Sequence, residues 1–250
     1  MVLLAGGFGT RVAHLLPNIP KPMADVAGHP FVEWVIKYYV SCGIGEFILS
    51  TGYLSETIEH HFASKPVPSA HVLCRKETTP LGTAGGFLNA IEALPEPRNG
   101  WLVANADSLV AENPNSLIDS ARSNNWSVAI LGLEVPDASR FGSLKIAADG
   151  TLKAFAEKRP GTGLINGGVY WFGPGCCCNF PANKPLSFEV DVFPHLLSKG
   201  LRIGVVPVSA PFIDIGTPSS LAEAESFVTK LKKKANLPIY NHDNKSPATA

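Results

Sequence analysis

Short apolar runs alternate with helical patterns through the first 135 residues of the chain. The apolar runs predict five strands, at Val2–Ala5, Glu46–Ser50, Ala70–Cys74, Trp101–Ala104 and Ser127–Leu133. The segments between them predict four helices, at Phe31–Cys42, Ser55–Phe62, Ala84–Ala93 and Ser116–Ser123. We expect Trp34, Tyr38 and Tyr39 on the first helix to belong to the core. This alternation of strands and helices predicts a mostly parallel, doubly wound α/β sheet with helices on both faces.

The pattern changes after residue 135 and becomes richer in β-structure. Asp149-Gly150 separates two apolar segments, Gly142–Ala147 and Thr151–Glu157, and is a strong signal for a β-hairpin turn. Further strands are predicted at Leu164–Phe172, Arg202–Val208 and Pro211–Ile215, and helices within Pro185–Leu197 after Ser187 and at Pro218–Lys234. Residues 236–250 are polar and contain proline, which predicts a loose tail. We therefore expect one domain over residues 1–235, with halves 1–135 and 136–235.

Composition and charge narrow the class of function. Lys+Arg and Asp+Glu both number 21, so the formal net charge is zero. This balance argues against nucleic-acid and membrane-surface binding, although a few local cations suffice for a small anionic ligand. We see no signal peptide and no apolar run near the roughly 18–20 residues that cross a bilayer. The chain is therefore expected in the cytoplasm.

Cysteines and histidines offer two weaker candidates for a metal site. Five cysteines are present, and Cys176, Cys177 and Cys178 are consecutive, which is unlike a secreted disulfide framework. Reduced thiols are the simplest interpretation, and zinc stays a weaker alternative because adjacent cysteines rarely all reach one metal. His60 and His61 are adjacent on a predicted helix and point in different directions, so we expect both at the surface.

A glycine cluster follows the first predicted strand. In Leu4-Ala5-Gly6-Gly7-Phe8-Gly9-Thr10-Arg11 the glycines allow successive backbone N–H groups to face an anion, although a tight turn alone would also use them. Lys21 follows in Pro20-Lys21-Pro22-Met23, where we expect the prolines to hold it on a rigid, non-helical segment. A backbone nest with a guanidinium and an ammonium group suits a triphosphate. The loop is not a Walker A motif and lacks Gly-x-Gly-x-x-Gly, which argues against a dinucleotide-binding oxidoreductase.

Two aspartates close predicted strands in the two halves of the chain. Asp107 follows the strand at Trp101–Ala104, and Asp214 lies at the end of Pro211–Ile215. Either aspartate alone could simply cap a turn. Because open α/β sheets bind ligands at the carboxyl ends of their strands, we expect both aspartates and the glycine loop to share one cleft.

These segments together resemble the signature of the sugar-1-phosphate nucleotidylyltransferases. The resemblance extends to about residue 230 and recurs at residues 77–86, 105–107, 157–158, 166–168 and 212–218. It implies a Rossmann-like core of the GT-A type with a β-rich extension, so that residues 1–135 bind the nucleotide and residues 136–235 the sugar phosphate. It also implies a reaction in which a sugar 1-phosphate attacks the α-phosphorus of a nucleoside triphosphate and pyrophosphate leaves, without a covalent enzyme intermediate.

The resemblance also implies roles for individual residues. Catalysis is expected from Arg11, Lys21 and Asp107, and Mg²⁺ binding from Asp107 and Asp214. The nucleotide is expected to contact Leu4, Ala5, Gly6, Gly7, Gly9, Thr10, Arg11, Lys21, Glu77, Pro80, Gly82 and Thr83. The sugar phosphate is expected to contact Glu157, Lys158, Asn166 and Gly167. Lys158 would pair with the phosphate, Asn166 with a sugar hydroxyl, and Gly167 would let the sugar approach the backbone. The simpler alternative to sugar-phosphate binding is that Glu157 and Lys158 form a surface ion pair and that the glycines after Asn166 mark a bulged strand.

Several segments resemble, within this family, the short guanylyltransferases that act on D-glycero-α-D-manno-heptose 1-phosphate. They are Lys21–Ala24, Gly52–Glu56, Pro80–Thr83, Leu164–Tyr170 and Phe212–Gly216. This implies GTP and the heptose phosphate as substrates, and GDP-heptose for cell-surface polysaccharide as product. Mannose-1-phosphate guanylyltransferases and other hexose-1-phosphate enzymes share most of these residues. Their activities are therefore alternative functions for this chain.

A catalytically silent, nucleotide-sugar-sensing regulatory subunit is the alternative from another class. The complete set of Arg11, Lys21, Asp107, Lys158 and Asp214 favours an enzyme. A homo-oligomer is left open by the sequence.

Overall fold

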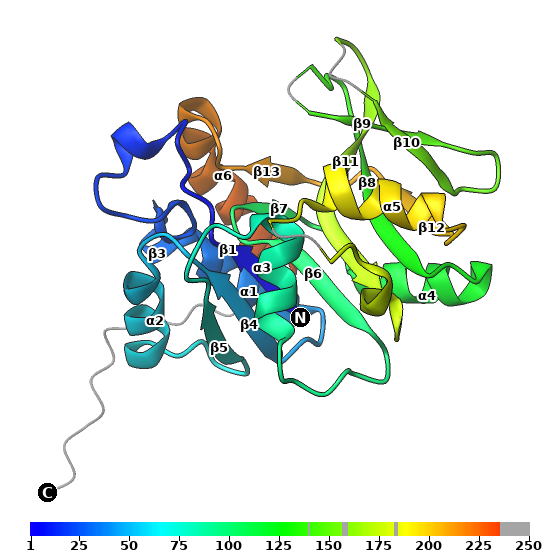
Figure 1. Cartoon of the computed structure of the whole chain (residues 1–250). Helices are drawn as coiled ribbons and strands as arrows, with labels where there is room; N and C mark the ends of the chain where they lie inside the picture. Colours follow the sequence, from blue (N-terminus) through cyan, green and yellow to red (C-terminus); the bar gives the residue numbers. More distant parts are fainter. Residues whose placement is uncertain (140, 157–159, 183–184, 236–250) are drawn as a thin grey trace, which may run out of the picture.

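A mixed β-sheet forms the centre of the molecule (Figure 1). The computed structural model describes residues 1–235 apart from 140, 157–159 and 183–184. Within these residues nine strands follow the order β10-β9-β11-β6-β1-β4-β5, with β8 paired to β11 and β12 paired to β8. Their bounds are β1 Val2–Ala5, β4 Glu46–Thr51, β5 His71–Lys76, β6 Trp101–Asn105, β8 Val128–Val135, β9 Ser143–Ile146, β10 Leu152–Ala156, β11 Gly163–Phe172 and β12 Ile203–Val208.

The strands of the N-terminal half are parallel, as the sequence predicts. Strand β1 lies between β4 and β6, with Val2 opposite Ile48 on one side and Val103 on the other. Strand β11 then runs antiparallel to both β6 and β8, and the predicted hairpin is the antiparallel pair β9 and β10. All three carboxyl ends of β1, β4 and β6 therefore reach the same edge of the sheet, where the loops that follow them meet.

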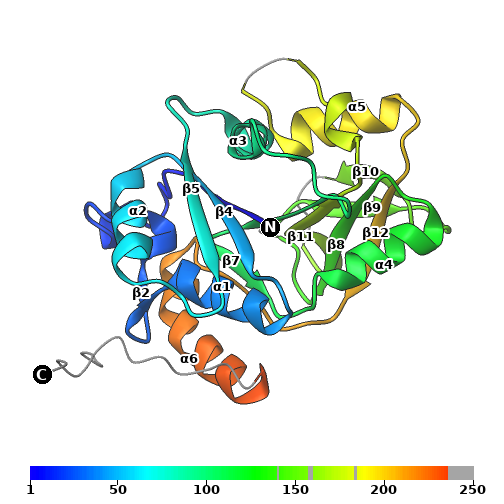
Figure 2. The same cartoon turned by 90° about the horizontal axis from the view of Figure 1, so that it is seen from below.

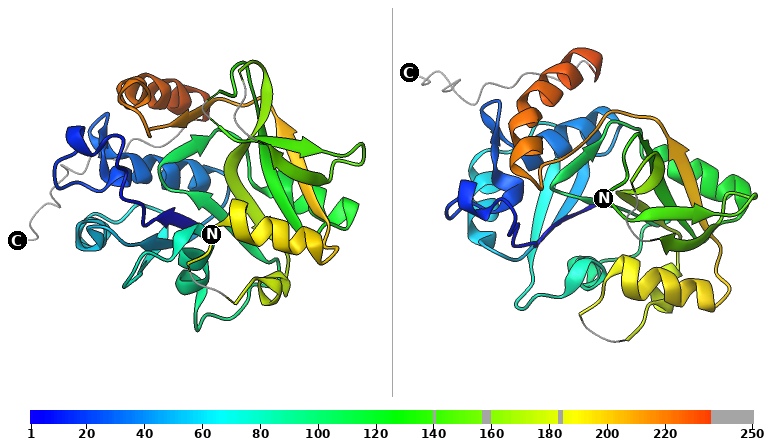
Figure 3. Two further views of the ribbon diagram at one scale, coloured as in Figure 1. Left: turned by 45° about the horizontal axis from the view of Figure 1, so that its top comes forward. Right: turned by 90° about the horizontal axis from the view of Figure 1, so that it is seen from above.

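Helices cover both faces of the sheet and create two apolar cores (Figure 2). One face carries α1 Phe31–Ser41, α2 Ser55–Ser64, α4 Asn115–Asn124 and α6 Pro218–Ala235, and α6 packs beside α1 (Figure 3). The other face carries α3 Gly82–Ile91, η4 Phe188–Val192 and α5 Phe193–Ser198. Successive side chains of a strand alternate between these cores: Leu3 contributes to the first and Val2 to the second. Trp34, Tyr38 and Tyr39 are buried, as predicted.

The predicted helix after Ser187 begins with a wide π-helical turn, η4, and continues as α5. The Ser187 hydroxyl caps its first turn by accepting a hydrogen bond from Val190 N. Pro194 lies in the first turn of α5 and has no N–H to donate back along the helix. The loss of that donor accounts for the local departure from α-helical geometry.

Several short elements were not predicted, and one of them corrects an expectation about Lys21. The loop after β1 contains the single turns η1 Ala13–Leu15 and η2 Lys21–Met23, so Lys21 begins a 3₁₀ turn and is not on a non-helical segment. Pro20 is extended and Pro22 occupies the second position of this turn, where a missing N–H costs nothing. Another is β7 Ser108–Val110, which pairs with β13 Phe212–Asp214.

Two smaller features complete the description. Strands β2 Asp25–Val26 and β3 His29–Pro30 form a short hairpin, and η3 Cys176–Asn179 contains the consecutive cysteines.

His60 is exposed as predicted, but the expectation for His61 is wrong, because its Nε2 lies 3.1 Å from Oε2 of the fully buried Glu33. Within the part of the chain that the structure describes, no helix is long and apolar enough to cross a membrane.

Candidate active site

A cavity of about 330 Å³ lies at the carboxyl ends of β1, β4 and β6. Seven of the residues predicted to bind the nucleotide line it: Leu4, Gly6, Gly7, Glu77, Pro80, Gly82 and Thr83. The remaining loop residues are placed differently. Ala5 is buried at the end of β1, and Gly9 and Thr10 lie further along the loop. The cavity also reaches Asp107, which follows β6.

The glycines of the loop after β1 are required for different reasons. A Cβ on Gly6 would lie 2.6 Å from Oε1 of Glu77, so a side chain there would displace that carboxylate. Gly9 has φ +59, a conformation that other residues rarely adopt. A Cβ on Gly7 would meet nothing within 4 Å. Packing within the protein therefore does not explain Gly7, and its bare backbone faces the cavity.

Glu77 is held at the other end of this cavity, where β5 ends. Its Oε2 accepts a hydrogen bond from Leu81 N at 3.3 Å. A Cβ on Gly52 would lie 2.5 Å from Oε1, so Gly6 and Gly52 together leave the space that this carboxylate fills. Burial raises the pKa of the Glu77 carboxyl above its usual value, and the bond from Leu81 N partly offsets that rise.

Asp107 and Asp214 are brought together by the short pairing of β7 with β13. In this pair Asp214 lies opposite Ser108, the neighbour of Asp107, and Ile215 N donates to the Asp107 carbonyl. The two aspartates therefore share a cleft, as predicted, but Asp214 lies on this separate two-stranded sheet and not on the main one. In Figure 1 β13, near the C-terminus, lies beside β7.

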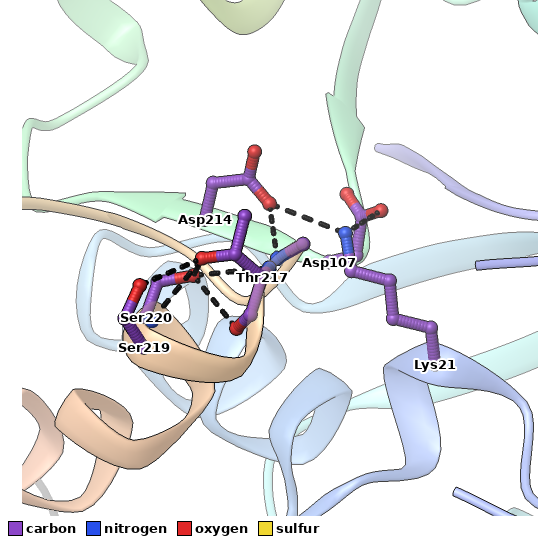
Figure 4. Close-up of polar contacts among 7 residues, drawn as sticks. Lys21, Asp107, Asp214, Thr217, Ser219 and Ser220 are labelled. Atoms are coloured by element: carbon purple, nitrogen blue, oxygen red, sulfur yellow. Dashed lines mark hydrogen bonds and ion pairs between the residues drawn. The ribbon is translucent and has the colours of Figure 1, made fainter. Parts of the chain in front are cut away.

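Lys21 lies between the two carboxylates (Figure 4). Its Nζ is 2.7 Å from Asp107 Oδ2 and 3.2 Å from Asp214 Oδ1, and its side chain is only 8% exposed. Gly216 N also donates to Asp214 Oδ1 at 2.7 Å, which fixes the orientation of that carboxylate. One buried cation thus offsets part of the negative charge of two acidic groups that the fold places next to each other.

Arg11 joins this group from the end of the glycine loop. A Cβ on Gly216 would lie 3.0 Å from both Arg11 Nη2 and Lys21 Nζ, so these two cations converge at Gly216. The Arg11 side chain is otherwise exposed. Both predicted catalytic cations, and both predicted metal-binding aspartates, are therefore neighbours in the folded chain, although they come from widely separated positions in the sequence.

The donor set at Asp107 and Asp214 fits a magnesium ion. Hard divalent cations prefer oxygen ligands, and Mg²⁺ is commonly held by one or two carboxylates together with waters and substrate phosphates. Among the described residues no group of three or more His, Cys, Asp or Glu side chains is arranged to hold a metal. A metal at this position would therefore take two protein carboxylates and complete its shell from the substrate.

A second cavity, of about 160 Å³, adjoins the first. It shares Asn105 and Asp107 with the first cavity and includes Asp214. Of the residues predicted to bind the sugar phosphate, Asn166 and Gly167 line it, whereas Glu157 and Lys158 lie outside the described residues. The two cavities meet at Asp107, so ligands in them would face each other across the aspartates.

Gly167 and Gly168 form an irregularity in β11, where its register with β8 shifts between Asn166 and Tyr170. A Cβ on Gly167 would lie 2.9 Å from the Leu131 carbonyl oxygen, so internal packing already requires glycine there. Gly168 has φ +70, and its Cβ would lie 2.5 Å from Asn105 Nδ2. The bulge brings this backbone close to Asn105, at the point where the two cavities meet.

The loop before α3 is joined to the segment before η4. Leu186 O accepts hydrogen bonds from Ala84 N and Gly85 N, and Leu186 N donates to Leu81 O. Thr83 Oγ1 accepts a bond from Phe188 N at 3.0 Å. Thr83 therefore both lines the first cavity and anchors η4, which borders the second.

Several residues that line these cavities were missed in the sequence, among them Glu189 and Phe8. Glu189 lines the second cavity from η4, and no local pattern distinguishes it from an ordinary surface acid. Phe8 lines the first cavity, is 56% exposed, and lies with its ring centroid 5.4 Å from that of Tyr53. The sequence did contain a signal for Phe8. An aromatic residue inside a glycine loop belongs to no helix or strand that would bury its side chain, so a place at the cavity could have been predicted.

Comparisons with known proteins identify relatives of this chain. The model of the family described as Nucleotidyl transferase matches residues 1–231. The chain is 32% identical over 229 residues to mannose-1-phosphate guanylyltransferase of Mycobacterium tuberculosis, covering 90% of this chain and 63% of that protein. It is 30% identical over 218 residues to D-glycero-alpha-D-manno-heptose 1-phosphate guanylyltransferase of Campylobacter jejuni, covering 87% of this chain and 94% of that protein.

A solved structure of a similar protein has the same fold as this chain. HddC from Yersinia pseudotuberculosis, complexed with GMP-PN, superposes with a TM-score of 0.80 at 33% identity. The match covers 90% of this chain and 97% of HddC. The α/β fold with its β-rich extension is thus the fold of that structure.

Proposed function

The chain belongs to the nucleotidyl transferase family, as the sequence predicts, and we propose that it is a sugar-1-phosphate guanylyltransferase. The observation that carries this proposal is the convergence of Arg11, Lys21, Asp107 and Asp214 where two cavities meet. A nucleoside triphosphate in the first cavity and a sugar 1-phosphate in the second would place their phosphates at this junction. We propose D-glycero-α-D-manno-heptose 1-phosphate as the sugar and GDP-heptose as the product.

The proposed reaction is a direct displacement at phosphorus. A phosphate oxygen of the sugar 1-phosphate forms a bond to the α-phosphorus of GTP. The bond from that phosphorus to the oxygen bridging to the β-phosphate breaks, and this oxygen leaves with pyrophosphate. The main physical obstacle is the repulsion between two anions, so positioning and charge neutralisation supply most of the catalysis.

The chain's cations and the glycine loop meet this need. Arg11 and Lys21 neutralise charge on the triphosphate and on the departing pyrophosphate. The exposed backbone at Gly7 lets phosphate oxygens approach the N–H groups of the loop. Asp107 and Asp214 would hold Mg²⁺, which would supply positive charge to neutralise the phosphates. Glu157 and Lys158 are proposed at the sugar phosphate by resemblance alone.

Guanine is the base that best suits Glu77. A carboxylate offers two acceptors side by side, and guanine has two adjacent donors, N1–H and the N2 amino group, on its pairing edge. Uracil and thymine place carbonyl oxygens on both sides of their single N–H, which would repel the carboxylate. Adenine and cytosine each place a ring acceptor beside their amino group. The carboxylate of Glu77 in the first cavity therefore supports GTP.

Pyrophosphate release tests the proposal directly. We expect the pair of GTP and D-glycero-α-D-manno-heptose 1-phosphate to be fastest in a matrix of four nucleoside triphosphates and the heptose, mannose and glucose 1-phosphates, and magnesium to be required. A preference for mannose 1-phosphate would change the sugar, and a preference for UTP or dTTP would overturn the guanylyl assignment. Release with none of the pairs would favour a regulatory subunit. The cytoplasmic location and a homo-oligomer stay predictions.

A further inference from the structure

The segment that enters η4 is hydrogen-bonded to the loop before α3, which lines the first cavity. Leu186 N donates to Leu81 O at 2.8 Å, and Leu186 O accepts from Ala84 N at 2.9 Å. Two residues further on, Phe188 N donates to Thr83 Oγ1 at 3.0 Å. The loop and the start of η4 are therefore joined by both main-chain and side-chain hydrogen bonds, although 105 residues separate Thr83 from Phe188.

Close packing makes this connection rigid. Gly82 has φ +74, and a Cβ on it would lie 2.4 Å from Leu186 O, so the two backbones are in direct contact. Leu186 and Phe188 are 2% and 1% exposed, and the Phe188 ring centroid lies 5.8 Å from that of Phe87 on α3. Because a packed interior has low compressibility, a shift of residues 81–83 displaces residues 186–188 as well.

The turn η4 depends on Thr83 for one of the hydrogen bonds at its start. The first N–H groups of a helix have no partner within the helix and need other acceptors. Ser187 N donates to Asp191 Oδ2 at 2.7 Å and Val190 N to Ser187 Oγ at 3.4 Å, so both of these acceptors lie in the same turn. The acceptor for Phe188 N comes instead from the loop before α3. Removing Thr83 Oγ1 would leave this buried N–H without that partner.

The connection links the two cavities. Thr83 is exposed and lines the first cavity, where the nucleotide is expected. Glu189, the residue after Phe188, lines the second cavity. A ligand that orders the loop at Thr83 therefore also orders η4, and a second ligand that needs η4 in place then loses less conformational freedom on binding. Such coupling acts equally in both directions, because the two binding free energies are linked.

We propose that Thr83 is a positioning residue for the second substrate, and that its hydrogen bond from Phe188 couples nucleotide binding in the first cavity to sugar 1-phosphate binding in the second. The proposal rests on the proposed function, because it concerns the two substrates of that reaction. Thr83 acts through η4 and needs no contact with the sugar. A residue of the nucleotide loop should therefore change the affinity for the other substrate.

Hydrogen exchange tests the connection with GTP alone. GTP and MgCl₂ are added to the full chain without a sugar phosphate, so no turnover occurs, and exchange of the backbone amides of residues 186–192 is followed by mass spectrometry. We expect saturating GTP to slow this exchange at least about fivefold in the wild type, the lower end of typical coupling between two sites. Unchanged exchange in the GTP complex would overturn the proposal, whatever the variants do.

Three variants separate the connection from the stability of η4 itself. Thr83→Val keeps the shape of the side chain but removes the acceptor, and Thr83→Ser restores it. Ser187→Ala is the matched control, because it removes a hydroxyl that caps the same turn from within. We expect saturating GTP to leave the exchange unchanged in Thr83→Val, and to slow it in Thr83→Ser and Ser187→Ala as in the wild type.

Binding of the second substrate measures the same coupling as a ratio of affinities. The affinity for D-glycero-α-D-manno-heptose 1-phosphate is determined on the free chain and on its complex with the α,β-methylene analogue of GTP, in which the bond that breaks is replaced. We expect the analogue to tighten sugar binding about 5- to 150-fold in the wild type and in Ser187→Ala, and less than about twofold in Thr83→Val. Equal ratios in the wild type and Thr83→Val would overturn the role of Thr83.

The failure of this proposal is distinct from failure of the proposed function. If the wild type releases no pyrophosphate with any pair of substrates, the proposed function fails, and the coupling of its two substrates fails with it. If the wild type is active and GTP leaves the exchange of residues 186–192 unchanged, only the role of Thr83 is refuted. The comparison of free and GTP-bound wild type needs no variant, so it decides the question even if Thr83→Val does not fold.

Discussion

Removal of the Lys21 ammonium should separate its part in catalysis from its part in stability. The Nζ atom lies 2.7 Å from Asp107 Oδ2 and 3.2 Å from Asp214 Oδ1, and the Lys21 side chain is 8% exposed. Lys21→Ala removes the ion-pair partner that the two adjacent carboxylates share. Losing one partner of a fully buried ion pair costs about 3–5 kcal/mol, but the Asp107 side chain is 35% exposed, so we expect about 1–3 kcal/mol.

The loss of turnover should be much larger than this loss of stability implies. Removing one preorganised group that stabilises transition-state charge typically lowers kcat about 100- to 1,000-fold. We expect Lys21→Ala to fold, to unfold about 2–10 °C below the wild type without divalent metal, and to lose at least about 100-fold in pyrophosphate release. Adding MgCl₂ should restore more stability to the variant than to the wild type, because a divalent cation replaces the missing charge at the two aspartates.

Lys37→Ala is the matched control for loss of a buried lysine. Lys37 is 2% exposed and its Nζ lies 2.8 Å from Glu33 Oε1, on α1. We expect Lys37→Ala to unfold at lower temperature, to gain nothing specific from MgCl₂, and to keep its turnover where it is folded. Turnover of Lys21→Ala within tenfold of the wild type would refute the catalytic role of Lys21. Equal MgCl₂ effects on Lys21→Ala and the wild type would refute the metal site.

Three further outcomes are expected. Glu77→Gln should lower kcat/KM for GTP about 10- to 100-fold. Because burial raises the pKa of Glu77, kcat/KM of the wild type for GTP should fall as the pH drops toward that raised pKa. A pH profile of Glu77→Gln should lack this fall at low pH. Gly7→Ala should leave the unfolding temperature unchanged, because its Cβ meets nothing, yet raise the KM for GTP about tenfold or more, as steady-state kinetics would show. Glu33→Gln should cost about 3–5 kcal/mol in urea unfolding, because the buried Lys37 loses its partner; a loss below about 1 kcal/mol would contradict this reasoning.

Much of the fold follows from local periodicity. Strand β1 and the glycine loop after it were predicted within a few residues, because an apolar run ending in glycines is a short-range signal. The hairpin of β9 and β10 was predicted from Asp149-Gly150, and Gly150 has the positive φ that such a turn uses. These features depend on neighbouring residues, so the sequence alone determines them.

Other features depended on contacts between distant parts of the chain. His61 was expected at the surface from its neighbour His60, but its ring reaches Glu33 on another helix. Lys21 was expected on a non-helical segment, but flanking prolines are also compatible with a single 3₁₀ turn. A local pattern cannot distinguish such cases, because the deciding partner lies elsewhere in the sequence.

The sequence by itself determined the elements of the α/β core and the glycine loop, since each rests on residues close together along the chain. It also determined the family, because the combination of short motifs along the whole chain can be recognised without knowing how they pack. Only the tertiary structure decided how the site is assembled. The pairing of β7 with β13 places Asp214 beside Asp107 across more than one hundred residues, and β11 with η4 places Asn166 against Glu189. Such pairings are formed by folding of the whole chain, which buries apolar surface on both faces of one sheet, and no local pattern encodes them.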